Sequence, residues 1–173
     1  MHNLDETIEI LTRTPGALQS LLQGLSQAWI TGNYGDGTWS AGEVVGHLLI
    51  AEREDGMPRL RRILQHGESL SFDPFAHNAT IPGGVAVPMQ HLLDQFKALR
   101  ATNLQELAAL HLSPADLART GMHPALGRVT AAQLLSTWAV HDLHHLRQIC
   151  LAMAWQHREE VGPWRAYLNT LAR

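Results

Sequence analysis

The stretch that decides the fold is TAAQLLSTWAVHDLHHLRQICLAMAW, residues 130–155. It contains neither proline nor glycine, and its apolar residues recur at three- and four-residue steps, as is typical of an amphipathic helix. Thr130 and Gln133 have the spacing of a capping box, in which a hydroxyl accepts from a free amide and an amide side chain reaches back. The sequence therefore predicts one long helix that begins at Thr130.

Three histidines, at positions 141, 144 and 145, lie at the centre of this predicted helix. His141 and His145 would be one turn apart on one face, with Cβ atoms roughly 5–6 Å apart, a spacing at which two imidazoles can bind one metal ion. His144 competes with His145, because residues three apart also share a face. On a helical wheel with His141 at zero, His145 falls at roughly 40°, inside the apolar arc, and His144 falls at roughly 300°, outside it. We therefore expect His145 to point inward with His141, and His144 to point away.

Two other residues of this helix raise separate questions. The wheel places Asp142 in the middle of the apolar arc, where a bare carboxylate would be costly. Its partner could be an arginine, another hydrogen-bond donor or a subunit interface. Cys150, the only cysteine, lies on the apolar side and is expected to be a packed core residue. A single cysteine excludes an internal disulfide and fits a reducing cytoplasm, where we expect the protein to be located.

Apolar periodicity predicts three further long helical stretches, at residues 4–30, 40–64 and 88–110. The first should kink or break near Pro15, and Pro58 should bend or divide the second, which begins at a Ser40–Glu43 capping box. Short helices are expected after Ser113 and over residues 161–171, and residues 121–129 could be partly extended. The predicted fold is all-α: an antiparallel four-helix bundle with short additional helices, forming a single domain over residues 1–173.

The longest irregular segment is residues 67–87, about the length at which a loop is usually functional or disordered. Its Phe72, Phe75 and His77 could cover one end of the bundle as a lid. A packed surface loop is the simpler interpretation. His123, in another expected connection, could also reach the mouth of a site.

Composition excludes several classes of function. The formal net charge of −3 gives no basic footprint for nucleic acid. No stretch approaches the roughly 20 apolar residues that span a bilayer, and the N-terminus lacks a signal-peptide pattern. We therefore expect no nucleic-acid and no membrane partner. The 11 histidines are the exceptional count, and they make a histidine-based site worth seeking.

Two motifs resemble those of a known family. Residues 39–48, WSAGEVVGHL, are similar to the Trp-Ser-x-x-Glu-x-x-x-His-Leu signature that opens the second helix of DinB/YfiT-like proteins. Residues 141–149, HDLHHLRQI, resemble the fourth-helix motif of the same superfamily, His-x-x-His-His-x-x-Gln-Ile. The resemblance covers most of the chain in the order and spacing of its elements.

The resemblance implies a four-helix bundle with three histidine ligands, His47, His141 and His145, around a divalent metal, often zinc or nickel. Some relatives are thiol transferases that use mycothiol, bacillithiol or glutathione, and many have no known activity. A low-molecular-weight thiol is therefore an expected co-substrate. The implied ligand set agrees with the wheel, which selects His145 over His144.

Three neutral imidazoles and an open position make a catalytic metal site, at which a bound water or thiol would lose its proton near neutral pH. One hypothesis is thus a metal-dependent thiol S-transferase or hydrolase acting on a small molecule. The other is a non-catalytic, metal-binding or stress-associated dimeric bundle. Without metal, the histidines would be hydrogen-bonded core residues. We expect a homodimer in either case, and Glu43, Glu54 or Gln148 as partners of the ligand rings. Arg59, Arg61 and Arg62 form a basic cluster, which we expect on a solvated face, although it could instead meet an anionic thiol cofactor.

Overall fold

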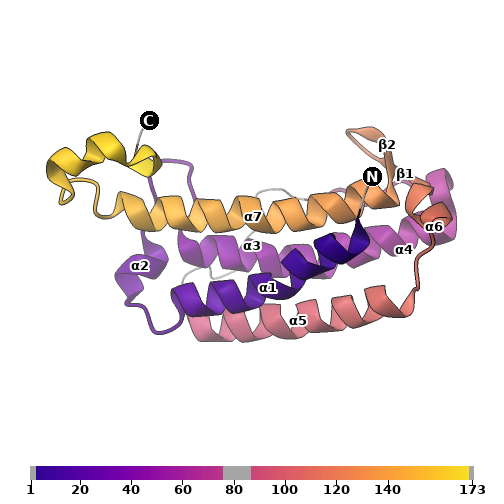
Figure 1. The fold of residues 1–173 in the computed structure, drawn as a ribbon, viewed down its shortest axis with the longest axis horizontal. Helices are drawn as coiled ribbons and strands as arrows, with labels where there is room; N and C mark the ends of the chain where they lie inside the picture. Colours follow the sequence, from indigo (N-terminus) through magenta and orange to yellow (C-terminus); the bar gives the residue numbers. More distant parts are fainter. Residues whose placement is uncertain (1–2, 76–86, 172–173) are drawn as a thin grey trace.

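The computed structural model describes residues 3–75 and 87–171. Four long helical segments lie side by side (Figure 1): α1 (Leu4–Leu22), α3 (Ala41–Glu54) continued by α4 (Gly56–His66), α5 (Met89–Ala109) and α7 (Ala131–Trp155). The short elements are α2 (Gln27–Thr31), α6 (Pro114–Ala118), the 3-10 helices η1 (Gly67–Ser69), η3 (Gly162–Tyr167) and η4 (Asn169–Leu171), and the strands β1 (Thr120–His123) and β2 (Gly127–Thr130). The predicted all-α four-helix bundle is confirmed, and residues 120–130 form a small antiparallel hairpin.

The predicted helix starts are confirmed by their hydrogen bonds. At α7, the Thr130 hydroxyl accepts from the Gln133 amide at 3.1 Å, and the Gln133 side chain accepts from the Thr130 amide at 2.8 Å. At α3, the Ser40 amide donates to the Glu43 carboxylate at 2.8 Å. These boxes satisfy backbone donors that have no partner within the helix. They therefore fix where the helices that carry the three predicted ligands begin.

Of the kink or break expected near Pro15, the break does not occur, because α1 continues through Pro15 to Leu22. A proline inside a helix leaves the carbonyl four residues earlier without its usual donor. Here that carbonyl belongs to Leu11, and it accepts instead from Arg100 Nη1 at 2.7 Å. A side chain from α5 thus replaces the missing backbone bond. The chain breaks at residues 23–26 instead.

The second helical stretch divides as predicted, between Glu54 and Gly56, and Pro58 lies in the first turn of α4. Glycine is required at this point because α7 passes close by. A Cβ atom on Gly56 would lie 2.8 Å from the indole of Trp138. The division therefore lies where the chain packs against Trp138 of α7.

Two apolar clusters fill the bundle. One includes Leu18, Val45, Leu48, Phe96 and Ile149, and the other Leu11, Leu60, Ile63, Leu135 and Trp138. Phe72 belongs to the second cluster and is only 3% exposed, so this part of the irregular segment is packed core. His77 lies outside the described residues.

A buried polar cluster joins α1, α3, α5 and α7 and contains the partner of Asp142. Arg100 on α5 donates to Asp142 Oδ2 at 2.7 Å and through Nε to Glu52 Oε1 at 2.9 Å. Glu52 also accepts from Asn103 at 2.8 Å and from the Trp138 indole at 2.9 Å. Burial raises the pKa of Asp142, and Arg100 opposes that rise. Of the partners left open by the sequence, the arginine is the correct one.

The expected core position of Cys150 is wrong: the residue is exposed, because it lies on the far side of α7 from the core. The expected short C-terminal helix is present as two 3-10 helices, η3 and η4, and Trp164 and Tyr167 are 71% and 80% exposed. Only Leu171 of that segment is buried. Within residues 3–75 and 87–171, no helix is long and apolar enough to cross a bilayer.

Candidate metal centre

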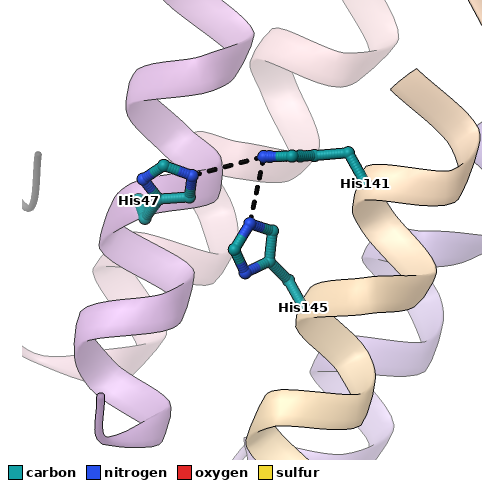
Figure 2. Close-up of side chains that lie close together, drawn as sticks. All are labelled: His47, His141 and His145. Atoms are coloured by element: carbon teal, nitrogen blue, oxygen red, sulfur yellow. Dashed lines mark hydrogen bonds between the residues drawn. The ribbon is translucent and has the colours of Figure 1, made fainter. Parts of the chain in front are cut away.

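Helices α3 and α7 bring the three predicted ligands together. His47 lies two turns into α3, and His141 and His145 lie one turn apart on α7. Figure 2 shows the three imidazole rings pointing toward one another from the two helices. His47 is 2% exposed and His145 5%, while His141 is half-buried.

The spacing of the ring nitrogens suits a metal ion. His141 Nε2 lies 3.3 Å from His47 Nε2 and 3.0 Å from His145 Nε2, and the three nitrogens lie within 4.8 Å of one another. Two nitrogens that each bind a tetrahedral metal at about 2.0–2.1 Å are about 3.3 Å apart. The three histidines therefore form a cluster that could hold a divalent ion.

The hydrogen bonding of His145 fixes which nitrogen is available. Its Nδ1 lies 2.6 Å from Gln148 Oε1, which can only accept, so Nδ1 carries the proton. The Nε2 lone pair then points at the other two rings, as it does in metal-binding histidines whose second nitrogen donates to an oxygen. Gln148 was among the predicted partners. Glu43 is instead held by Ser40 at the start of α3, and Glu54 is exposed.

The surroundings keep two of the rings uncharged. Burial, with the neighbouring histidines, lowers the pKa of His141 to about 3 and that of His145 to about 4. Both rings are therefore neutral at pH 7, with lone pairs available to a metal ion. Two cations could not occupy this space without strong repulsion.

Aromatic rings form the walls around the cluster. The Trp39 ring centroid lies 4.8 Å from that of His47 and 6.0 Å from that of His145, with which it stacks. Phe75 meets His47 edge-on at 5.7 Å. These contacts limit rotation of the imidazoles and shield them from water on those sides.

A cleft of about 440 Å³ opens directly onto the three histidines. Its lining also includes Tyr34, Thr38, Trp39, His144 and Gln148. His144 is exposed, as the wheel predicts, and its ring lies 5.2 Å from that of His145. A small molecule could therefore reach the point at which the three Nε2 atoms converge.

A second cavity also has His141 in its lining. His123 lines this cavity rather than the open cleft, so the loop histidine does lie near the site, as the sequence allowed. Arg59, expected on a solvated face, is only 8% exposed and pairs with Asp55 at 2.8 Å. Their four-residue spacing on one helix was the available signal for that pair. Tyr34 and Thr38 were also missed, because nothing in their turn-rich segment points to a site.

Comparisons with known proteins agree with the fold. Bacillus subtilis YfiT, described as a probable metal-dependent hydrolase with an unusual four-helix bundle topology, superposes with a TM-score of 0.76 at 20% identity, over 91% of this chain and 87% of YfiT. The four-helix bundle protein TT2238 gives a TM-score of 0.58 at 26% identity, over 84% of this chain and 96% of that protein. No curated protein sequence is significantly similar to the chain. The family profile of the DinB superfamily matches residues 10–149, which include both motifs and all three histidines. The chain belongs to the DinB superfamily.

Proposed function

We propose that this protein is a metal-dependent enzyme that acts on a small molecule, with His47, His141 and His145 as ligands of a zinc or nickel ion. The observation that carries the proposal is the convergence of three Nε2 atoms beside an open cleft. A divalent metal held there would supply a Lewis acid that makes water or a thiol acidic enough to react near neutral pH.

The protein's own residues support such a site in several ways. Gln148 holds the His145 ring with its Nε2 lone pair toward the cluster. Trp39 covers one side of the rings, and the cleft leaves another side open to substrate. A structural metal site would be closed by a fourth protein ligand. The open cleft thus favours catalysis over the non-catalytic alternative.

Two reaction types fit this arrangement, hydrolysis and transfer of a low-molecular-weight thiol. The description of YfiT as a probable metal-dependent hydrolase supports the first. The neutral ligand set supports the second, because three imidazoles leave the charge of a divalent ion uncompensated and so favour an incoming thiolate. The only cysteine, Cys150, is exposed and does not line the cleft. No cysteine of the chain can therefore be the nucleophile, and we propose water or an added thiol in that role.

The test uses protein loaded with zinc or nickel and a panel of esters, lactones and alkyl halides, each with and without glutathione. A hydrolase converts substrate without thiol, and a transferase requires it. Replacing His141 by Ala should reduce turnover by about a hundred-fold or more, whereas His144→Ala should retain it. No turnover above buffer, or equal turnover in both variants, would contradict the proposal.

The expected homodimer and cytoplasmic location remain predictions. Helix α7 exposes two apolar side chains, Val140 at 63% and Leu143 at 48%, which would suit an interface between two copies. Sedimentation of the native chain beside Val140→Asp would decide the oligomeric state.

A further inference from the structure

The second cavity beside His141 has a volume of about 190 Å³. Its walls come from four parts of the chain: the start of α4, the segment after η1, the β1–β2 hairpin and the first half of α7. His141 lines both this cavity and the open cleft. The cavity therefore adjoins the three-histidine cluster at His141.

The walls of this cavity are mainly apolar. Phe72 and Leu134 contribute buried faces, and Leu126 and Val129 line it from the hairpin. The hairpin needs a glycine to approach this wall, because a Cβ atom on Gly121 would lie 3.0 Å from the Phe72 ring. Burying an apolar group against such a surface is favourable, whereas burying a charged group there is not.

Among the described residues of the lining, the cation Arg59 is already balanced by an acid. The Arg59 guanidinium lies 5.2 Å from the Phe72 ring centroid and 5.8 Å from that of Phe75, and its Nη1 lies 2.8 Å from Asp55. A second anion would have to compete with Asp55 for this guanidinium. The pair therefore presents a flat, net-neutral surface rather than an anion site.

His123 adds a polar but uncharged group at the same wall. Its Nδ1 lies 3.1 Å from the backbone nitrogens of both Ala125 and Leu126, which can only donate. The ring proton is therefore on Nε2. The His123 ring packs edge-on against Phe72, with the centroids 6.1 Å apart.

The size of the cavity sets the group that it can hold. A cavity of about 150 Å³ lined by apolar side chains binds benzene in another protein. We propose that the 190 Å³ cavity binds an uncharged apolar group of the substrate, about as large as a benzene ring, while the reacting group lies at the three histidines. This inference rests on the proposed function and adds a substrate class to it: small molecules that carry an aryl or branched alkyl group next to the reactive bond.

The test measures binding of three hydroxamic acids, which attach to a protein-bound divalent metal through the same group, to the zinc-loaded full chain by calorimetry. Phenylacetohydroxamate should bind about ten-fold or more tightly than acetohydroxamate, because its ring is covered by the cavity. Succinomonohydroxamate, which carries a carboxylate, should bind no more tightly than acetohydroxamate.

Leu126→Asp should remove most of the preference for the phenyl compound while leaving acetohydroxamate affinity unchanged. Leu126 is 76% exposed, so the variant should fold. The matched control is Leu168→Asp, at an exposed leucine (41%) that does not line the cavity. It should keep the preference.

Each other outcome has a distinct meaning. Equal affinity for the phenyl and methyl compounds, or an equal effect of the two Asp variants, would overturn the apolar cavity and leave the metal site intact. Tightest binding of the succinate compound would show that Arg59 selects an anion, which also overturns the inference. If no hydroxamate binds, the proposed function fails, and the inference fails with it.

Discussion

Replacing Arg100 by Met should be among the most destabilising single changes in this protein. Arg100 is 1% exposed and makes five hydrogen bonds, to Glu52, Asp142 and the Leu11 carbonyl. Methionine is of similar length and apolar, so packing changes little. The change leaves two buried carboxylates without a cation and leaves the carbonyl opposite Pro15 without a donor.

Removing one partner of a buried ion pair costs about 3–5 kcal/mol, which is a large part of the roughly 5–15 kcal/mol that stabilises a typical domain. Urea unfolding followed by far-UV circular dichroism measures the change. The matched control is Arg128→Met. The Arg128 side chain is 68% exposed and pairs with Glu68, and an exposed pair contributes about 0–1 kcal/mol.

Asp142→Asn is an informative companion to Arg100→Met. The cluster holds one cation and two carboxylates, and burial already raises the pKa of Asp142. Neutralising this carboxylate leaves Arg100 paired with Glu52, so we expect a smaller loss, about 1–2 kcal/mol. The reasoning would be refuted if Arg100→Met lost no more free energy of unfolding than Arg128→Met, or less than Asp142→Asn.

Two further predictions concern stability. The pKa of His145 is about 4 in the folded chain, below the unfolded value of about 6.5, so acid protonates the unfolded state first. Metal-free protein should therefore lose stability as the pH falls below 6.5, with His145 accounting for about 2 kcal/mol at pH 5. Urea unfolding in chelator at pH 7 and pH 5 tests this; a His145→Gln variant with the same pH dependence as the native chain would count against it. Gly56→Ala should cost about 1–3 kcal/mol because its Cβ would meet Trp138, whereas Gly16→Ala, with nothing within 4 Å, should stabilise α1 by about 0.5–1 kcal/mol. Equal effects of the two alanines on the urea midpoint would show that the contact with Trp138 does not limit packing.

The elements that sequence reasoning predicted well are those set by local rules. Helix α7 begins at its capping box, and the wheel alone separates the inward His145 from the exposed His144. The gathering of His47 with His141 was implied by the family resemblance, because no local rule says which turn of α3 faces α7. The structure brings the three together with Nε2 to Nε2 distances of 3.0 and 3.3 Å.

The expectations that failed depend on contacts between distant parts of the chain. Pro15 is tolerated inside α1 because Arg100, from α5, donates to the Leu11 carbonyl. Arg59 is buried beside Phe72, which comes from the segment after η1, and the cluster of Arg59, Arg61 and Arg62 does not reveal that contact. Periodicity describes the face of one helix, whereas these outcomes depend on what the next helix places against it.

The most direct test of the central claim is the metal content of the untagged protein, measured by elemental mass spectrometry after incubation with zinc or nickel and removal of the free ion. The proposed site predicts close to one metal ion per chain. His47→Ala, His141→Ala and His145→Ala should each lose the metal, and His144→Ala should retain it. If the native chain holds no metal after incubation, or if His144→Ala loses it as fully as His145→Ala, the three-histidine metal site is contradicted.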